Sequence, residues 1–227
     1  MHLLAPTVLR VTPEEFQARV RARFGNDLRR AGSFAQLCLL GAQACLDACS
    51  GEGRLGVLWS SKLGALKAVR AGLDDGLRRG EPAMPLTFIA MQPHLAGALL
   101  TQRGHPVSRS AHVHLAGEDW SLLLHAAQGW LAECERVLIG WVEESDAPGR
   151  EHRSDWCLFQ NEPAAAAVRC EPAPHADTAL AATTEDWIAR IAEWRAPPHP
   201  PLLLRAGTDA WRFTHEGSSG SAVYFSP

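Results

Sequence analysis

The chain has 227 residues, of which 46% are hydrophobic and 21% charged, and its formal net charge at pH 7 is −3. This length fits one large domain with a buried core, and so small a net charge excludes a global field that attracts nucleic acid. No apolar run approaches the roughly 20 residues that a membrane-spanning helix needs, and the first residues do not resemble a secretory signal. We therefore expect a single cytoplasmic domain over 1–227.

Helices and strands alternate after an N-terminal arm over residues 1–30. Hydrophobic periodicity predicts, in chain order, a helix over 34–49, a buried strand over 54–61, a helix over 64–79, an apolar segment over 86–91, a helix over 93–100, a strand over 110–115, a helix over 119–132 and a buried strand over 136–142. Ser33 and Asp119 are the expected N-caps. Leu73 and Leu77 are expected on the inward face of their helix. This alternation is typical of a layered α/β domain.

The rest of the chain is predicted to add further strands and one helix. The expected features, in chain order, are a polar loop over 145–155, a hairpin made of 156–160 and 164–170, an amphipathic helix over 183–194, a proline-rich connector over 197–201, a strand over 202–216 and a flexible tail over 217–227. Thr183 or Thr184 is the expected cap of the helix. No internal repeat and no domain boundary is visible.

The cysteines predict no metal site. There are six, without a CxxC pair, and in a cytosolic chain such residues are best interpreted as small buried hydrophobes. Cys45 and Cys49 are four apart and could share a helix face, but no second pair matches them. We predict neither a metal nor a cofactor.

Two histidines and two acidic residues lie near the turn that follows residue 115. His112 and His114 are two apart on a predicted strand, so both point to one face, and we expect them close to Glu118 and Asp119. A buried carboxylate there could act as a general base, and two histidines with a carboxylate could bind a metal. A carboxylate in the first turn of a helix is more often a cap, which is the preferred interpretation.

Three segments carry a family resemblance: LGVLWSSKLG (55–64), PLTFIAMQPHLAGAL (85–99) and RVLIGWVEE (136–144). Together with the helices between them, their order resembles the N-terminal half of a β-ketoacyl synthase, over about residues 30 to 170. The chain is most similar to short, single-half ketosynthase-like proteins of bacterial aryl-polyene and xanthomonadin-type pigment clusters. The resemblance implies a thiolase-like half-fold, a mixed β-sheet flanked by helices, which is normally dimeric.

The same resemblance places a catalytic cysteine at the turn before the 119–132 helix. This chain has Ala116, Gly117, Glu118 and Asp119 there, so Ala116 is the degenerate nucleophile position. The family's two catalytic histidines belong to its C-terminal half, and no His-Gly-Thr string follows Glu144. Because condensation needs an activated thiolate, we expect no catalytic residue for that reaction.

The function expected from this resemblance is that of a non-catalytic, chain-length-factor-like subunit in fatty-acid, polyketide or aryl-polyene pigment biosynthesis. It implies a homodimer, or a heterodimer with a ketosynthase, formed through the 110–115 strand. An acyl carrier protein is a further candidate partner, met by arginines such as Arg103 and Arg109. Two alternatives stay open. One is a small acyltransferase or thioesterase that uses His112, His114 or Glu118, and the other is a metal-binding protein.

Overall fold

The computed structural model describes residues 1–49, 51–80, 84–145, 147, 149–163, 168–173, 182–183, 186–194, 201–206 and 209–215. Its strands are β1 (His2–Val11), β2 (Leu55–Ser61), β3 (Val107–His114), β4 (Arg136–Glu143), β5 (His152–Gln160), β6 (Val168–Pro172), β7 (Ala182–Thr183), β8 (Leu202–Ala206) and β9 (Asp209–His215). Its helices are α1 (Pro13–Phe24), α2 (Ser33–Asp47), α3 (Leu66–Arg78), α4 (Pro85–Ala90), α5 (Leu95–Gln102), α6 (Trp120–Trp130) and α8 (Trp187–Trp194).

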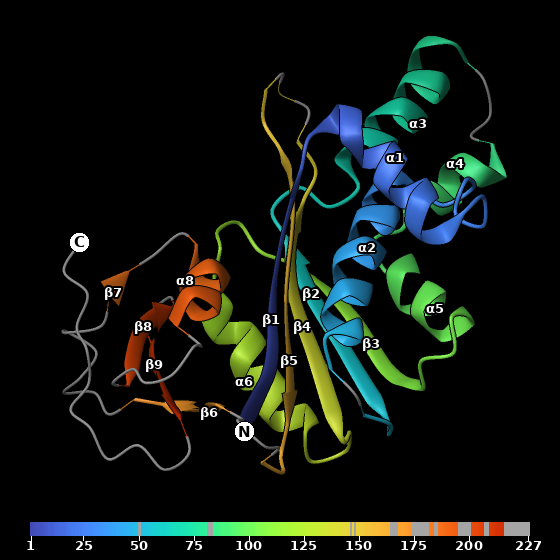
Figure 1. Cartoon of the computed structure of the whole chain (residues 1–227). Coiled ribbons are helices and arrows are strands. Elements are labelled where there is room, and N and C mark those ends of the chain that lie inside the picture. Colours follow the sequence, from blue (N-terminus) through green and yellow to red (C-terminus); the bar gives the residue numbers. More distant parts are fainter. Residues whose placement is uncertain are drawn as a thin grey trace.

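The described strands form one mixed sheet in the order β3-β2-β4-β5-β1-β6-β9-β8-β7. β2 is parallel to both β3 and β4, while β5 is antiparallel to β4 and to β1. Helices α2 and α5 pack on one face of the sheet, with α1, α3 and α4 on the same side of it, and α6 and α8 cover the other face (Figure 1). Because both faces are covered, the central strands are buried along nearly their whole length, as in other doubly covered sheets.

The two larger hydrophobic cores of the described residues lie on the two faces of the sheet, and successive side chains of one strand enter different cores. In β5, Trp156 and Leu158 pack in the core beneath α2, whereas Cys157 and Phe159 pack in the core beneath α6 and α8. This alternation follows from the two-residue repeat of an extended strand. It decides which functional side chains can meet.

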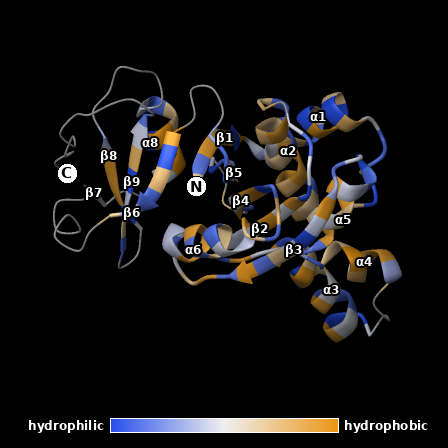
Figure 2. Ribbon diagram, turned by 90° about the horizontal axis from the view of Figure 1, so that it is seen from below, coloured by the Kyte–Doolittle hydropathy of each residue, from blue (hydrophilic) through white to orange (hydrophobic). Residues whose placement is uncertain are grey.

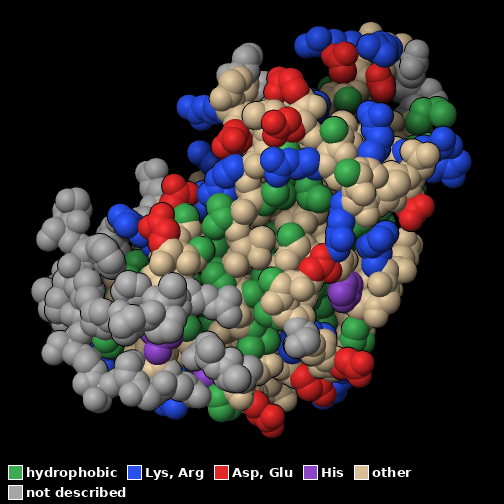
Figure 3. Space-filling view, in the orientation of Figure 1, with side chains coloured by type: hydrophobic (Ala, Val, Ile, Leu, Met, Phe, Trp, Pro, Cys, Tyr) green, Lys and Arg blue, Asp and Glu red, His purple; other side chains and the backbone are tan. Residues whose placement is uncertain are grey.

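The surface is mixed in charge, and β3 lies at its margin. On the face drawn in Figure 3, Lys and Arg side chains alternate with Asp and Glu over the part of the molecule that α1 to α4 form. Seen from below (Figure 2), β3 runs along the outer edge of the sheet, with α6 to one side and α4 to the other. One side of β3 therefore has no neighbouring strand among the described residues.

Most of the predicted regular elements are confirmed. The helices predicted over 34–49 and 119–132 are α2 and α6, and the strands predicted over 54–61 and 136–142 are β2 and β4. Asp119 caps α6 as predicted. Gly32 is the N-cap of α2, with Ser33 as the first helical residue. The apolar segment over 86–91 forms most of the short helix α4.

The expected N-terminal arm is instead part of the sheet. Residues 1–30 contain β1, which lies between β5 and β6, and the helix α1. The pairing of β1 with β5 joins positions about 150 residues apart, such as Val11 and His152. Periodicity within a short window cannot reveal such a partner, because it reports burial and not which strands pair.

The predicted hairpin of 156–160 and 164–170 is wrong, since β1 separates β5 from β6. The strand β5 also begins at His152, inside the predicted loop, and the strand predicted over 202–216 is divided into β8 and β9. Thr183 lies in β7, so it does not cap the helix α8, which begins at Trp187. Thr184, the connector apart from Pro201, and the tail over 217–227 lie outside the described residues.

Leu73 and Leu77 do not face inward. Their exposed fractions are 54% and 82%, because α3 extends from the body of the molecule and packs on α4 rather than on the sheet (Figure 1). None of the described helices is both long and apolar enough to span a membrane.

Candidate functional site

The turn between β3 and α6, which we call the elbow (residues 115–119), follows the carboxyl end of a parallel strand. Asp119 is extended and accepts a hydrogen bond from the backbone N–H of Ser121 at 2.9 Å, which satisfies a free donor of the first helical turn. Ala116 and Gly117 are exposed, and a Cβ added at Gly117 would meet no atom within 4 Å. The elbow is therefore open and presents no nucleophilic side chain at Ala116.

Glu118 is held in place by three hydrogen bonds. Nη1 and Nη2 of Arg153 each donate to one of its carboxylate oxygens at 2.6 Å, and Nε1 of Trp120 donates at 2.7 Å. Burial raises the pKa of Glu118, although the bonds from Arg153 and Trp120 act in the opposite direction. The carboxylates of Glu118 and Asp155 raise the pKa of Arg153 against its burial. The Glu118 carboxylate thus forms an ion pair with the Arg153 guanidinium.

That ion pair belongs to a larger charged cluster, which we call the arginine cluster. Asp155 has no exposed surface and accepts hydrogen bonds from both Arg10 and Arg153. Arg10 also donates to Asp186, next to the first residue of α8, at 3.1 Å. Buried charges are tolerated where their hydrogen-bonding capacity is met in this way. The cluster joins β1, β5, the elbow and the start of α8.

His112 lies on the other face of the sheet. Its Nε2 is hydrogen-bonded with Oγ of Ser61 at 2.8 Å, and its ring meets Phe34 of α2 edge-on, with 5.9 Å between centroids. Burial, with smaller effects of His114 and His94, lowers the pKa of His112 to about 4. The imidazole is therefore neutral at neutral pH, which makes it able to accept a proton but only a weak base.

The structure does not bring the histidines and the acidic residues together. His112 faces α2, whereas Glu118 meets Arg153 on the face that α6 and α8 cover. His114 is exposed at the end of β3. Among the described residues, no three His, Cys, Asp or Glu side chains are grouped so that they could hold a metal ion.

Sequence reasoning missed Ser61 and Glu143. Ser61 is buried at the carboxyl end of β2, beside the strand that carries His112. Glu143, at the end of β4, accepts a hydrogen bond from the backbone N–H of Lys62 and so orders the turn after β2; burial raises its pKa. Ser61 and Glu143 could have been found from the sequence, because neighbouring parallel strands such as β2 and β4 bring their carboxyl ends together.

No thiol occupies the elbow. Cys157 is buried in the middle of β5. Cys134 lies near the amino ends of the parallel strands, away from the elbow, with its Sγ 3.4 Å from Oγ of Ser108. Burial raises the pKa of Cys38 and of Cys170 well above the usual thiol range, so both stay protonated and unreactive.

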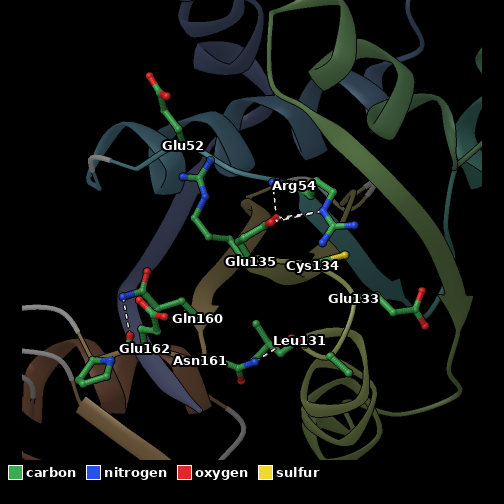
Figure 4. A pocket seen from close by; sticks show the side chains of 12 residues that line it. Glu52, Arg54, Leu131, Glu133, Cys134, Glu135, Gln160, Asn161 and Glu162 are labelled. Atoms are coloured by element: carbon green, nitrogen blue, oxygen red, sulfur yellow. Dashed lines mark hydrogen bonds and ion pairs between the residues drawn. The ribbon is translucent and has the colours of Figure 1, made fainter.

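A hollow of about 590 Å³ (Figure 4) lies at the amino ends of the parallel strands β2 and β4, whereas the elbow follows the carboxyl end of β3. Arg54 and Glu135 meet across it, with the Glu135 carboxylate accepting from the Arg54 backbone N–H at 2.6 Å and from Nε at 3.3 Å. At its lower end, Asn161 donates to the carbonyl of Leu131 at 2.7 Å. The hollow is lined mainly by polar and charged side chains, and its central carboxylate is already bound to an arginine.

Comparison with known proteins identifies the fold. No family model and no curated protein matches the chain. A structure described as the ketosynthase ApeO in complex with its chain length factor ApeC, from Xenorhabdus doucetiae, is similar at 14% identity. The match covers 93% of this chain and 98% of that chain, with a TM-score of 0.59.

Two further structures show weaker similarity. The ishigamide ketosynthase/chain length factor matches at 16% identity over 74% of this chain and 68% of that chain, with a TM-score of 0.49. The AntDE:AntF complex, a type II acyl-carrier protein with its ketosynthase, matches at 14% identity. The match covers 76% of this chain and 69% of that chain, with a TM-score of 0.49. The first comparison confirms the predicted fold class: the chain has a ketosynthase-like, thiolase-like fold with a mixed sheet flanked by helices.

Proposed function

We propose that the chain is a non-catalytic, ketosynthase-like subunit that resembles a chain length factor. The observation that carries the proposal is the composition of the elbow. In a ketosynthase-like fold this turn is where the resemblance places the condensing cysteine, and here Ala116 stands at that position while Arg153 binds the adjacent Glu118. Fold alone does not assign an activity, so the chemistry of this turn carries the argument.

A condensing reaction needs a nucleophile that can form an acyl thioester and a base that activates it. The methyl group of Ala116 can do neither, and no cysteine approaches it. Glu118 does not replace the cysteine, because its carboxylate is neutralised and oriented by Arg153 and Trp120. The chain therefore needs a second, catalytic protein if it contributes to condensation.

We propose a ketosynthase as that partner, bound through β3 and the adjoining α3–α4 unit. Unpaired edge strands are templates for pairing with another chain, and exposed apolar patches mark contact surfaces. Large apolar side chains are exposed around α3 and α4; they are Leu63, Leu73, Leu77, Met84, Leu86, Phe88 and Ile89. In the view of Figure 2 both helices lie towards the same margin of the molecule as β3, although the helix that packs on β3 is α5. In the similar structure at 14% identity, a ketosynthase is in complex with its chain length factor.

An acyl carrier protein is the second partner that we propose, and it is expected to meet the assembled pair. The two arginines suggested by the sequence are already engaged. The Cζ atom of Arg103 lies over the ring of Phe24, 4.8 Å from its centroid, and Nη2 of Arg109 is 2.8 Å from Oε2 of Glu133. Exposed arginines around α1, such as Arg21, Arg29 and Arg30, are better placed to meet an acidic carrier.

Co-purification with the ketosynthase encoded beside this protein tests the proposal, with molar mass measured by light scattering. We expect a stable 1:1 complex, and a Leu77→Gln/Phe88→Gln variant that binds at least about tenfold more weakly. Val8→Gln, which changes an exposed apolar residue of β1, is the matched control and should bind normally. A chain that forms only homodimers, or that condenses acyl thioesters without a partner, contradicts the proposal.

The pathway is a separate part of the proposal, and we infer an aryl-polyene or related polyketide pigment. Deletion of the gene should abolish pigment, and complementation with an Ala116→Ser variant should restore it, because no chemistry is assigned to that position. Normal pigment in the deletion strain contradicts this assignment.

A second candidate function is acyl transfer or thioester hydrolysis, and the specific observation in its favour is the hydrogen bond between Ser61 and His112. A neutral imidazole beside a serine hydroxyl is the usual arrangement for activating that oxygen. Ser61 has no exposed surface, however, so substrate would have to displace the turn above it. Hydrolysis of acyl-carrier thioesters that is lost in His112→Asn and kept in His114→Ala supports this candidate. Background turnover in the wild type removes it.

A further inference from the structure

A second hollow, of about 490 Å³, lies at the amino edge of the parallel strands, between the turn before β2 and the turn after α5. We call it the glycine hollow. Its lining residues are Gly51, Glu52, Gly53, Arg54, Gly104, His105, Pro106 and Arg136. It is distinct from the elbow, which lies at the opposite, carboxyl ends of the parallel strands. A ligand bound in the glycine hollow does not depend on the function proposed above.

Arg136, the first residue of β4, supplies an unusual group to this hollow. Only 5% of its surface is exposed, and its Nε is buried without a hydrogen-bond partner among the described residues. The side chain of Arg136 lines both the glycine hollow and the hollow of about 590 Å³, so it lies between the two. A buried, charged donor without a hydrogen-bond partner costs free energy that a bound anion can recover.

The nearby carboxylates do not provide that partner. Glu135 binds the backbone N–H and Nε of Arg54, and the Glu52 side chain points away from Arg54 and Glu135 in Figure 4. Both acids influence Arg136 electrostatically, but burial dominates and lowers the pKa of Arg136. Among the described residues of the hollow, Nε of Arg136 is therefore a buried donor without a hydrogen-bond partner.

The walls of the hollow are built from backbone. Gly53 and Gly104 have φ values of 111° and 87°, which side-chain-bearing residues rarely adopt. A Cβ at Gly51 would lie 3.4 Å from Nη1 of Arg136. The glycines thus leave space beside the guanidinium that a larger residue would fill, and backbone approaching a ligand closely is a common use of glycine.

We propose that the glycine hollow binds a small oxyanion, either a carboxylate or a phosphate, with the Arg136 guanidinium as its principal ligand. The planar fork of an arginine matches both groups through paired N–H donors. Arg54 is already paired with Glu135, so the lining cation with a buried donor that lacks a hydrogen-bond partner among the described residues is Arg136, and its charge favours an anion over a cation.

The pKa of His105 should show whether an anion is bound in the glycine hollow. Its Nε2 is 3.1 Å from Oε1 of Gln43, and burial, followed by the charge of Arg136, lowers its pKa; Arg103 acts in the same direction and Asp47 opposes them. An anion bound to Arg136 cancels that charge, so it should raise the pKa of His105. This readout does not require any catalytic activity.

The test is a titration of the ¹⁵N-labelled chain with inorganic phosphate and, separately, with acetate, each at an ionic strength matched with sodium chloride. We expect one or both anions to shift the amide signals of Gly51, Gly53 and Gly104 and to raise the pKa of His105. Binding of phosphate alone identifies phosphate esters as the ligand class, and binding of acetate alone identifies carboxylates; either result supports the proposal.

Variants separate a built site from general charge attraction. Arg136→Met should abolish the shifts, and it should be at least as stable as the wild type in anion-free buffer, because a buried unpaired charge is removed. Arg136→Lys, which lacks the fork, should bind at least about tenfold more weakly. Arg109→Met removes an exposed positive charge at the same edge and should bind normally.

The proposal is overturned if neither anion shifts these signals, or if Arg136→Met binds as tightly as the wild type. Shifts in the wild type that map only outside the glycine hollow overturn it as well, and that measurement remains decisive if Arg136→Met does not fold.

Discussion

Glu118 and Arg153 form a bidentate ion pair, with each Nη nitrogen of the arginine 2.6 Å from one carboxylate oxygen. Glu118 comes from the elbow after β3, whereas Arg153 comes from β5, and β2 and β4 lie between those two strands in the sheet. Only 18% of either side chain is exposed. The pair therefore ties the open end of a parallel strand to the antiparallel part of the sheet.

Replacing Arg153 with methionine should destabilise the chain strongly. The change leaves Glu118 and the buried Asp155 without one of their charged partners, and breaking one side of a buried ion pair typically costs about 3–5 kcal/mol. We expect the free energy of unfolding, measured by urea denaturation with tryptophan fluorescence, to fall by roughly that amount.

Arg19→Met is the control for this change. Arg19 pairs with Glu15 one turn away on α1, and about half of each side chain is exposed. Exposed pairs of this kind contribute roughly 0.3–0.5 kcal/mol. Equal losses in both variants would show that the arginine cluster contributes no more than a surface pair.

His112 should make stability fall as the pH is lowered. Its pKa is about 4 in the folded chain and about 6.5 when unfolded. The unfolded chain therefore binds more protons between those values, and the free energy of unfolding decreases as the pH falls through that window. Allowing for partial exposure to solvent, the loss is about 1–2 kcal/mol.

This pH effect can be isolated by comparing variants, because Glu118 and Glu143, whose pKa values are raised, act in the opposite direction. The difference in stability between wild type and His112→Asn should shrink from pH 7 to pH 4.5. A His112 pKa near 6.5 measured by NMR would contradict the expectation.

Gly140→Ala should disturb the packing of α2 on the sheet. A Cβ at Gly140 would overlap the indole of Trp156, which is fully buried. Overpacking of this kind costs roughly 1–3 kcal/mol, measurable by thermal or urea unfolding. Gly117→Ala at the elbow meets nothing and should change stability by less than about 0.5 kcal/mol; similar losses in both would mean that the close contact with Trp156 is not limiting.

Ala116→Cys tests whether the missing sulfur is all that the elbow lacks. Position 116 is exposed, whereas five of the six native cysteines are buried, so the introduced thiol should react with a disulfide reagent at least about tenfold faster than any of those five. We expect no condensation, because the imidazole of His112 faces α2 on the other side of the sheet and is hydrogen-bonded with Ser61. Acyl transfer to the introduced thiol, followed by carbon–carbon bond formation, would show that an activating base is present after all.

Several elements could be predicted because their signals are local. The stripes of α2 and α6 and the apolar runs of β2 and β4 report burial directly, and residues within one helix or strand determine them. Leu73 and Leu77 show the limit of this approach. Their spacing is that of a buried face, yet α3 projects from the sheet, and periodicity does not reveal whether a partner surface exists.

The site divides in the same way. That the elbow contains Ala116, and no cysteine, was determined by the sequence alone, as was the cap made by Asp119. Only the tertiary structure decided that Glu118 meets Arg153, that His112 meets Ser61 on the opposite face, and that Arg136 is buried beside a hollow. These contacts join residues 35 and 51 positions apart, or depend on which strands are neighbours. Local patterns encode burial and backbone conformation, whereas the pairing of distant charges depends on the strand order of the complete sheet.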